Sequence, residues 1–143
     1  MAHRPTDEVL QDLLDTAERA RERAYVPYSG FDAGAAVRTA QGATVVGSLV
    51  ENLVFGLAMC AERVALFQTV AAGAGRPLAL ALAAPPTAGE ATFPCGSCLQ
   101  VAAELGGMEM LIVVADPNDD GAPIQRTVAE LGPGLPHRKT LLT

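Results

Sequence analysis

Three cysteines and one glutamate are the residues of this sequence whose types and spacing best suit chemistry. Cys60 and Glu62 lie two residues apart, and the apolar residues that follow them recur at helical spacing as far as Val70. Cys95 and Cys98 form a Cys-x-x-Cys loop that opens a second helical segment. At a helix start, the unpaired backbone N–H groups and the positive end of the dipole favour thiolate and carboxylate over their protonated forms.

The chemistry that such residues perform together is catalysis at a metal ion. A Cys-x-x-Cys loop can present two sulfurs to one ion, and a third sulfur from another helix start leaves a tetrahedral Zn²⁺ with one open position. The predicted zinc ligands are therefore Cys60, Cys95 and Cys98. Glu62 is too close in sequence to Cys60 for comfortable ligation by both, and it is well placed to accept a proton from metal-bound water. This combination is described for zinc-dependent nucleobase deaminases, in which three cysteines are an accepted ligand set.

Other interpretations of the cysteines stay open at this point. A lone Cys at an apolar helix start is usually a small buried hydrophobic residue, and a Cys-x-x-Cys pair can be a redox pair. Neither interpretation accounts for all three cysteines together with Glu62. A closed structural zinc site would need a fourth ligand, and the only two histidines, His3 and His137, lie near the termini. The pattern therefore favours a catalytic zinc site.

Composition limits the class of protein. A chain of 143 residues has room for one domain with a core, so residues 1–143 are predicted to form a single domain. Half of the residues are hydrophobic but only 4% are aromatic, so the core must consist of small aliphatic side chains. A chain this apolar is expected to bury further surface in an oligomer. The net charge of -6 argues against a nucleic-acid polymer as partner, which leaves a small molecule as the expected substrate.

The sequence also carries expectations about location. It contains no run of 18 apolar residues, and residues 1–23 are charged throughout, so we expect neither a membrane span nor a signal peptide. An odd number of cysteines suits a reducing compartment. We therefore expect a cytoplasmic protein.

The elements that must position the cysteines alternate between helices and strands. Thr6 is the expected N-cap of a first helix that reaches Ala24 and is ended by Pro27. Gln41-Gly42 is typical of a hairpin turn. The remaining pattern predicts strands at 33–39, 44–50, 78–84, 110–114 and 124–127, helices at 60–72 and 95–105, and a helical turn at 128–131. Such a chain implies an α/β fold with a sheet of about five strands covered by helices on both faces.

Five blocks of the sequence together resemble the small, homotetrameric cytidine deaminases. They are Ala24-Tyr25-Val26-Pro27-Tyr28-Ser29-Gly30-Phe31, Gly34-Ala35-Ala36-Val37, Glu51-Asn52, Cys60-Ala61-Glu62-Arg63 and Pro94-Cys95-Gly96-Ser97-Cys98. The resemblance covers nearly the whole chain. It implies a three-layer α/β/α sandwich with a mixed sheet, a homotetramer, and zinc-dependent conversion of cytidine or deoxycytidine to uridine or deoxyuridine plus ammonia in pyrimidine salvage.

The resemblance also implies roles for individual residues. Phe31 would stack against the pyrimidine ring, although plain core packing is the alternative for this aromatic residue. Glu51 would grip a ribose hydroxyl, and the backbone of Ala61 and Ser97 would line the base pocket.

Two charged residues beside the cysteines have implied roles in the chemistry. Glu62 would take the proton of the metal-bound water and pass it to the ring and then to the leaving amino group. Arg63 would hydrogen-bond the thiolates and offset their negative charge, the alternative being an ordinary arginine on a helix surface.

Three leucines depart from the family pattern. Leu49 replaces an Asn that grips the ribose hydroxyl, Leu99 replaces an Arg after the second cysteine, and Leu135 lies where a Phe reaches a neighbouring subunit. Leu49 is therefore part of the predicted substrate pocket, and it favours an alternative in which the same zinc chemistry acts on a free base, a modified nucleoside or a blasticidin-like antibiotic. A non-catalytic zinc- or ligand-binding oligomer is an alternative of another class, against which the intact Cys-Ala-Glu argues.

Overall fold

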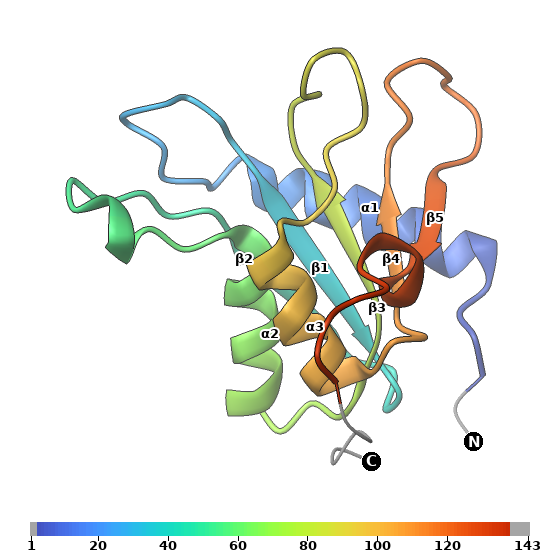
Figure 1. The fold of residues 1–143 in the computed structure, drawn as a ribbon. Coiled ribbons are helices and arrows are strands. Elements are labelled where there is room, and N and C mark those ends of the chain that lie inside the picture. The colour runs from blue at the N-terminus through green and yellow to red at the C-terminus, as the bar shows by residue number, and fades with distance from the viewer. Residues whose placement is uncertain (1–2, 138–143) are drawn as a thin grey trace.

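A five-stranded mixed sheet forms the centre of the computed structural model, which describes residues 3–137 (Figure 1). In chain order the elements are α1 (Asp7–Arg21), β1 (Gly34–Thr39), β2 (Thr44–Ser48), the 3₁₀ turn η1 (Phe55–Leu57), α2 (Ala61–Ala71), β3 (Pro77–Ala83), α3 (Gly96–Gly106), β4 (Leu111–Val114), β5 (Ile124–Thr127) and α4 (Val128–Leu131). The strand order is β2-β1-β3-β4-β5, and only β3 and β4 are parallel. Because parallel neighbours need a crossover, α3 lies between these two strands in the chain.

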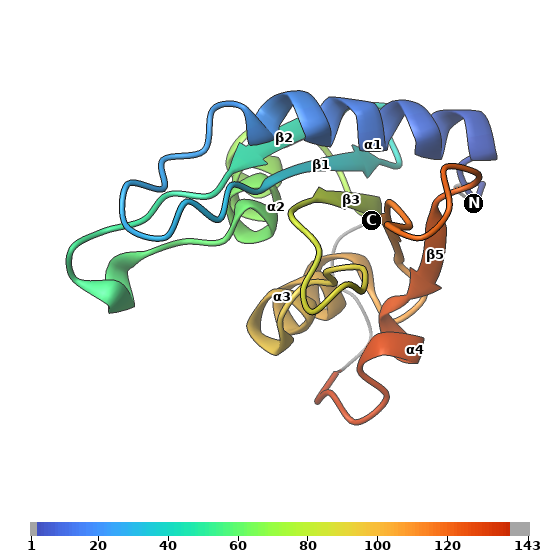
Figure 2. The ribbon, with the colours of Figure 1, turned by 90° about the horizontal axis from the view of Figure 1, so that it is seen from above.

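Helices cover both faces of the sheet, as predicted (Figure 2). One face carries α1, which packs on the alanines of β1 and β3 and on Leu111 and Val113 of β4. The opposite face carries α2 and α3 over the larger side chains Val37, Leu80 and Ile112. Successive side chains of a strand point to opposite faces, so this alternation divides the core into two layers. The predicted three-layer α/β/α arrangement is confirmed.

The first helix forms for the reasons that the sequence indicates. The Thr6 hydroxyl caps it by accepting a hydrogen bond from the Val9 amide at 3.3 Å. Its apolar stripe is buried against the sheet. The helix ends at Arg21 rather than at the predicted Ala24, because residues 22–24 turn to i→i−3 hydrogen bonds such as Ala24 N to Arg21 O at 3.1 Å.

The other predicted elements form within one or two residues of their expected ends. The hairpin between β1 and β2 closes at Gly42, whose φ of 85° is one that glycine adopts without strain. The sequence analysis did not anticipate η1, which lies in the protruding segment 50–59 (green in Figure 1). Within residues 3–137, every helix is too short or too polar to cross a lipid bilayer.

Gly47 sets the distance between β2 and α2. A Cβ at this buried position would meet the carbonyl oxygen of Ala61 and, at 2.5 Å, the amide nitrogen of Ala65. Both atoms are backbone of the first turns of α2, so they cannot move aside without shifting the helix that begins beside Cys60. The position of this helix start therefore depends on the absence of a side chain at residue 47.

We expect Gly47→Ala to lower the free energy of unfolding by about 1–3 kcal/mol, because the added methyl overpacks the contact between strand and helix. Urea denaturation measures this change. Gly134→Ala is the matched control, since a Cβ there meets nothing within 4 Å. Equal stability of the two variants would contradict the close approach of α2 to β2.

Candidate active site

The starts of two helices bring the three cysteines together. Cys60 is the N-cap residue of α2, Cys95 is the N-cap residue of α3, and Cys98 lies in the first turn of α3. These two helices lie side by side on one face of the sheet (Figure 1). Neither N-cap sulfur caps its own helix, so both are free to turn toward the neighbouring helix start. All three sulfurs lie within 4.8 Å of one another.

The donor set fits zinc. Zn–S bonds of about 2.3 Å in a tetrahedral site place the sulfurs about 3.8 Å apart. The Sγ atoms of Cys95 and Cys98 are 3.6 Å apart, and all three cysteines are free thiols. Among the described residues, the group contains three ligands and no fourth. Three thiolates without a fourth protein ligand match a site that keeps one position for a small molecule.

Arg63 lies next to the thiols. Its Nη2 donates a hydrogen bond to the Sγ of Cys60 at 3.4 Å. Hydrogen bonds from Cys98 and then Arg63 lower the pKa of Cys60 to about 5. The pKa of Cys98 is raised because this thiol donates to Cys60 and is buried. A Cys60 thiolate is thus stabilised by the guanidinium that it faces.

Glu62 is a buried carboxyl group in the first turn of α2. Its side chain is only 5% exposed, and this burial raises its pKa to about 7. A carboxyl group with a pKa near neutral can both accept and release a proton under ordinary conditions. The position of Glu62 therefore suits proton transfer better than a purely structural role.

Three segments meet beside Cys60. Val50 and Met59 exchange backbone hydrogen bonds at 3.1 and 2.9 Å, which ties the end of the β2 segment to the residue before Cys60. Tyr25, in the connection from α1 to β1, forms a parallel bridge with Val50. The structure thus brings residues 25–31, 49–51 and 59–62 to one end of the sheet.

The predicted substrate-binding residues lie in or next to these segments. Phe31 is 36% exposed, so its ring is not simply a core residue. Ala61 is fully buried at the start of α2. Leu49 packs its side chain against the core, and its backbone N–H donates to Ala33 O at 3.0 Å. Glu51 accepts hydrogen bonds from the backbone of the 25–31 segment.

The two other leucines that depart from the family pattern also contact the core of their own chain. Leu99 is only 6% exposed, within the core cluster that includes residues of α2 and α3. Leu135 packs against this cluster after α4, and the Gln100 side chain fixes the chain next to it by donating to Pro136 O at 2.8 Å. In the structure, neither side chain extends away from the molecule.

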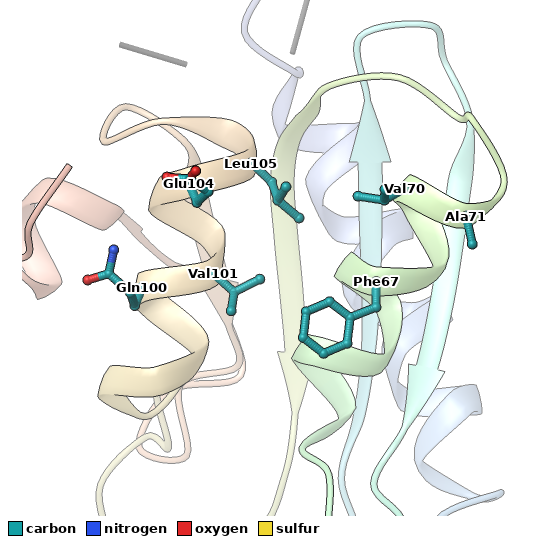
Figure 3. Close-up of a pocket in the computed structure, with 7 residues that line it drawn as sticks. All are labelled: Phe67, Val70, Ala71, Gln100, Val101, Glu104 and Leu105. Atoms are coloured by element: carbon teal, nitrogen blue, oxygen red, sulfur yellow. The ribbon is translucent and has the colours of Figure 1, made fainter. Parts of the chain in front are cut away.

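Sequence reasoning missed two features. The first is the pair of amides, Tyr28 N and Ser29 N, that bond the Glu51 carboxylate. The second is an apolar groove of about 580 Å³ between α2 and α3 (Figure 3). Its lining residues are Phe67, Val70, Ala71, Gln100, Val101, Glu104 and Leu105, none of which is a predicted site residue. The apolar all-round composition of α2 was the only signal for this groove.

Known proteins resemble this chain in sequence and in structure. The family profile described as "Cytidine and deoxycytidylate deaminase zinc-binding region" matches residues 7–115. A cytidine deaminase of Halalkalibacterium halodurans is 40% identical over 124 residues, 87% of this chain and 91% of the relative. One of Mycobacterium tuberculosis is 44% identical over 100 residues, 70% of this chain and 74% of the relative.

Solved structures agree with the sequence matches. The crystal structure of cytidine deaminase from Burkholderia pseudomallei superimposes with a TM-score of 0.76 and 38% identity, covering 87% of this chain and 97% of that one. The enzyme from Mycobacterium tuberculosis superimposes with a TM-score of 0.71 and 35% identity, covering 87% and 94%. Because the profile, the relatives and the fold all agree, this chain belongs to the cytidine and deoxycytidylate deaminase family.

Proposed function

We propose that this protein is a zinc-dependent hydrolase that converts cytidine or deoxycytidine and water to uridine or deoxyuridine and ammonia. The observation that carries the proposal is the group of three cysteine sulfurs within 4.8 Å of one another, next to a buried glutamate. The family match and the cytidine deaminases among the relatives support this reaction over the alternatives.

The proposed zinc ligands are Cys60, Cys95 and Cys98. A zinc ion held there supplies a Lewis acid that lowers the pKa of water toward neutrality. Three thiolate ligands would give such a site excess negative charge, and Arg63 would offset part of it through its hydrogen bond to the Cys60 sulfur. Leu99 carries no charge, so Arg63 supplies the only positive side chain within residues 60–63 and 95–100.

Glu62 is the proposed proton carrier. Its carboxylate would accept the first proton of the attacking water and pass it to the ring nitrogen. It would then accept the proton of the hydroxyl group formed at the attacked carbon and pass it to the leaving amino group. Burial suits this task because it raises the pKa of the carboxyl group to about 7, so neither the protonated nor the ionised form is strongly disfavoured at neutral pH.

In this proposal the substrate is held by residues of the three segments beside Cys60 and by Ser97 of α3. Phe31 stacks on the pyrimidine ring, the backbone of Ala61 and Ser97 contacts the base, and Glu51 accepts a hydrogen bond from the sugar. The partly exposed ring of Phe31 and the ionised carboxylate of Glu51, whose pKa is lowered first by the hydroxyl of Ser29, are consistent with these roles.

A second candidate function keeps the zinc chemistry and changes the substrate. The side chain of Leu49 packs on the core and offers no polar atom to a ribose hydroxyl, where the resembled family places an Asn. A buried hydroxyl without a partner costs about 1–3 kcal/mol. A free base, a modified nucleoside or a blasticidin-like antibiotic would avoid this cost if it presents no hydroxyl at that point.

We also propose that each chain folds as a single domain of residues 1–143 and that four chains form a homotetramer. This tetramer would work in the cytoplasm, in pyrimidine salvage. Residues 1–2 and 138–143 of that domain lie outside the described residues. Several large apolar side chains are exposed on the single chain, and their burial between copies of the chain would favour self-association. They are Leu53, Val54, Phe55 and Leu57 in the protruding segment, and Phe67 and Val70 on α2. The net charge of -6 supports a small substrate rather than a nucleic-acid polymer.

Cys98→Ala is expected to reduce bound zinc from about one ion per chain to a small fraction, because two thiolates cannot hold the ion tightly. Elemental analysis of the purified, dialysed protein measures the stoichiometry. Ser97→Ala, in the same helical turn, is the control and should retain its zinc. Full zinc occupancy in Cys98→Ala would contradict the ligand assignment.

Glu62→Gln should reduce ammonia release from cytidine by about 10²–10⁴-fold while leaving the zinc content unchanged, because the amide cannot carry the proton. A coupled ammonia assay on zinc-loaded protein measures the rate. Glu90→Gln, at an exposed glutamate in the connection between β3 and α3, is the control and should retain full activity. A loss of only a few-fold in Glu62→Gln would exclude it as the proton carrier.

Leu49→Asn is expected to raise kcat/KM for cytidine by about 5–150-fold, the equivalent of about 1–3 kcal/mol from a restored hydrogen bond to the ribose. Leu49→Ala, which removes the side chain without adding a polar group, is the control. Ammonia release from cytidine, deoxycytidine, cytosine and blasticidin S is compared for wild type and both variants. If the wild-type protein already turns over cytidine fastest and Leu49→Asn does not raise kcat/KM for cytidine, then Leu49 does not limit recognition of the ribose.

A further inference from the structure

The connection between α1 and β1 is a loop that displays aromatic rings without burying them. We call residues 24–32 the aromatic loop; it contains no helix, and its only β-bridge joins Tyr25 to Val50. Tyr25, Tyr28 and Phe31 are 56%, 53% and 36% exposed. Hydrophobic burial therefore contributes little to holding the two tyrosines in place, and it holds Phe31 only in part. Hydrogen bonds supply further restraint.

The start of the aromatic loop is fixed by backbone bonds to the segment after β2. Tyr25 N donates to Leu49 O at 2.8 Å, and Glu51 N donates to Tyr25 O at 2.8 Å. These bonds hold Tyr25, but they do not reach Phe31, which lies six residues further along the loop.

The far part of the aromatic loop is held on both sides of Phe31: Asp32 pairs with Arg21 Nη2 at 3.1 Å after it, and the Glu51 carboxylate binds the residues before it. Oε1 of Glu51 accepts hydrogen bonds from Tyr28 N at 3.1 Å and Ser29 N at 3.2 Å. The Ser29 hydroxyl beside this carboxylate is the largest cause of the lowered pKa of Glu51. The same hydroxyl oxygen accepts a hydrogen bond from Phe31 N at 3.0 Å. A continuous chain of hydrogen bonds thus runs from Glu51 through Ser29 to the backbone of Phe31.

The charge of Glu51 suits this task. Hydrogen bonds from backbone N–H groups to a carboxylate are about twice as strong as those to a neutral acceptor. A carboxylate has two oxygens, so it can accept several loop donors and still present an acceptor to a ligand. Glutamine at this position would keep one acceptor oxygen but lose the negative charge, whereas alanine would lose both the acceptor oxygens and the charge.

We propose that Glu51 is a positioning residue as well as a sugar contact: its carboxylate anchors the aromatic loop and thereby places Phe31 against the substrate ring. The link to substrate rests on the proposed function, whereas the anchoring of the loop is a property of the fold alone. Removing the carboxylate should therefore weaken recognition of the base even when the ligand has no sugar hydroxyl for Glu51 to bind.

The anchoring is tested first by amide hydrogen exchange, which needs no turnover. In Glu51→Ala, exchange at the amides of Tyr28 and Ser29 should be faster than in wild type by about tenfold or more, with a smaller change in Glu51→Gln. The control Glu90→Ala, at an exposed glutamate, should leave both amides unchanged. Unchanged exchange at Tyr28 and Ser29 in Glu51→Ala would overturn the proposal, whatever the enzyme's substrate is.

The effect on recognition is tested by comparing cytidine with 2′,3′-dideoxycytidine, assayed as substrate or as competitive inhibitor. If Glu51 positions Phe31, then Glu51→Ala lowers kcat/KM, or weakens competitive inhibition, by about tenfold or more for both compounds. When Phe31 is already replaced by alanine, most of the loss caused by Glu51→Ala should disappear for the dideoxy compound. A loss confined to cytidine would show that Glu51 acts only on the sugar and would overturn the positioning role.

Discussion

The convergence of two helix starts on one face of the sheet is the constraint on which the site depends. Three thiols from α2 and α3 lie within 4.8 Å of one another only because both helices begin at the same end of the sheet, side by side. Small residues make this possible, since Gly47 lets α2 lie directly on β2. A sheet face of larger residues beneath α2 and α3, and an alanine-rich face beneath α1, complete the support. The core of this protein therefore serves mainly to fix the relative position of two N-termini.

At the start of α2, Cys60 and Glu62 are close in sequence but have different electrostatic environments, which suit them to different roles. Cys60 shares its environment with Arg63 and Cys98, which stabilise its thiolate. Glu62, only two residues along, is buried, and this burial raises its pKa to about 7. One helical turn thus presents a sulfur suited to binding a cation and a carboxyl group suited to moving protons. The same short sequence could not achieve this in a strand, where Cys60 and Glu62 would share one face and one environment.

The sequence alone was sufficient for the five strands, the α-helices and the cysteine group, because these leave local patterns, whereas the short turn η1 was missed. The stripe of α1, the turn at Gly42 and the buried strands follow from periodicity and turn residues, and zinc ligands need cysteines at defined spacing. The hydrogen bonds of Glu51 to the aromatic loop could not be predicted, since they join residues more than twenty positions apart with no periodic signal. The burial of Leu99 depended likewise on packing between α2 and α3. The roles of Glu62, Phe31, Ala61 and Leu49 toward a substrate stay predictions.

The most direct test of the account is a metal removal and return experiment with cytidine as substrate. Ammonia and uridine are measured for purified protein, for the same protein after chelation, and after one equivalent of Zn²⁺ is restored. The account predicts equal amounts of the two products, loss of turnover on chelation, and recovery with zinc. Turnover that persists without metal, or no release of ammonia from any aminated pyrimidine by fully zinc-loaded protein, would contradict it.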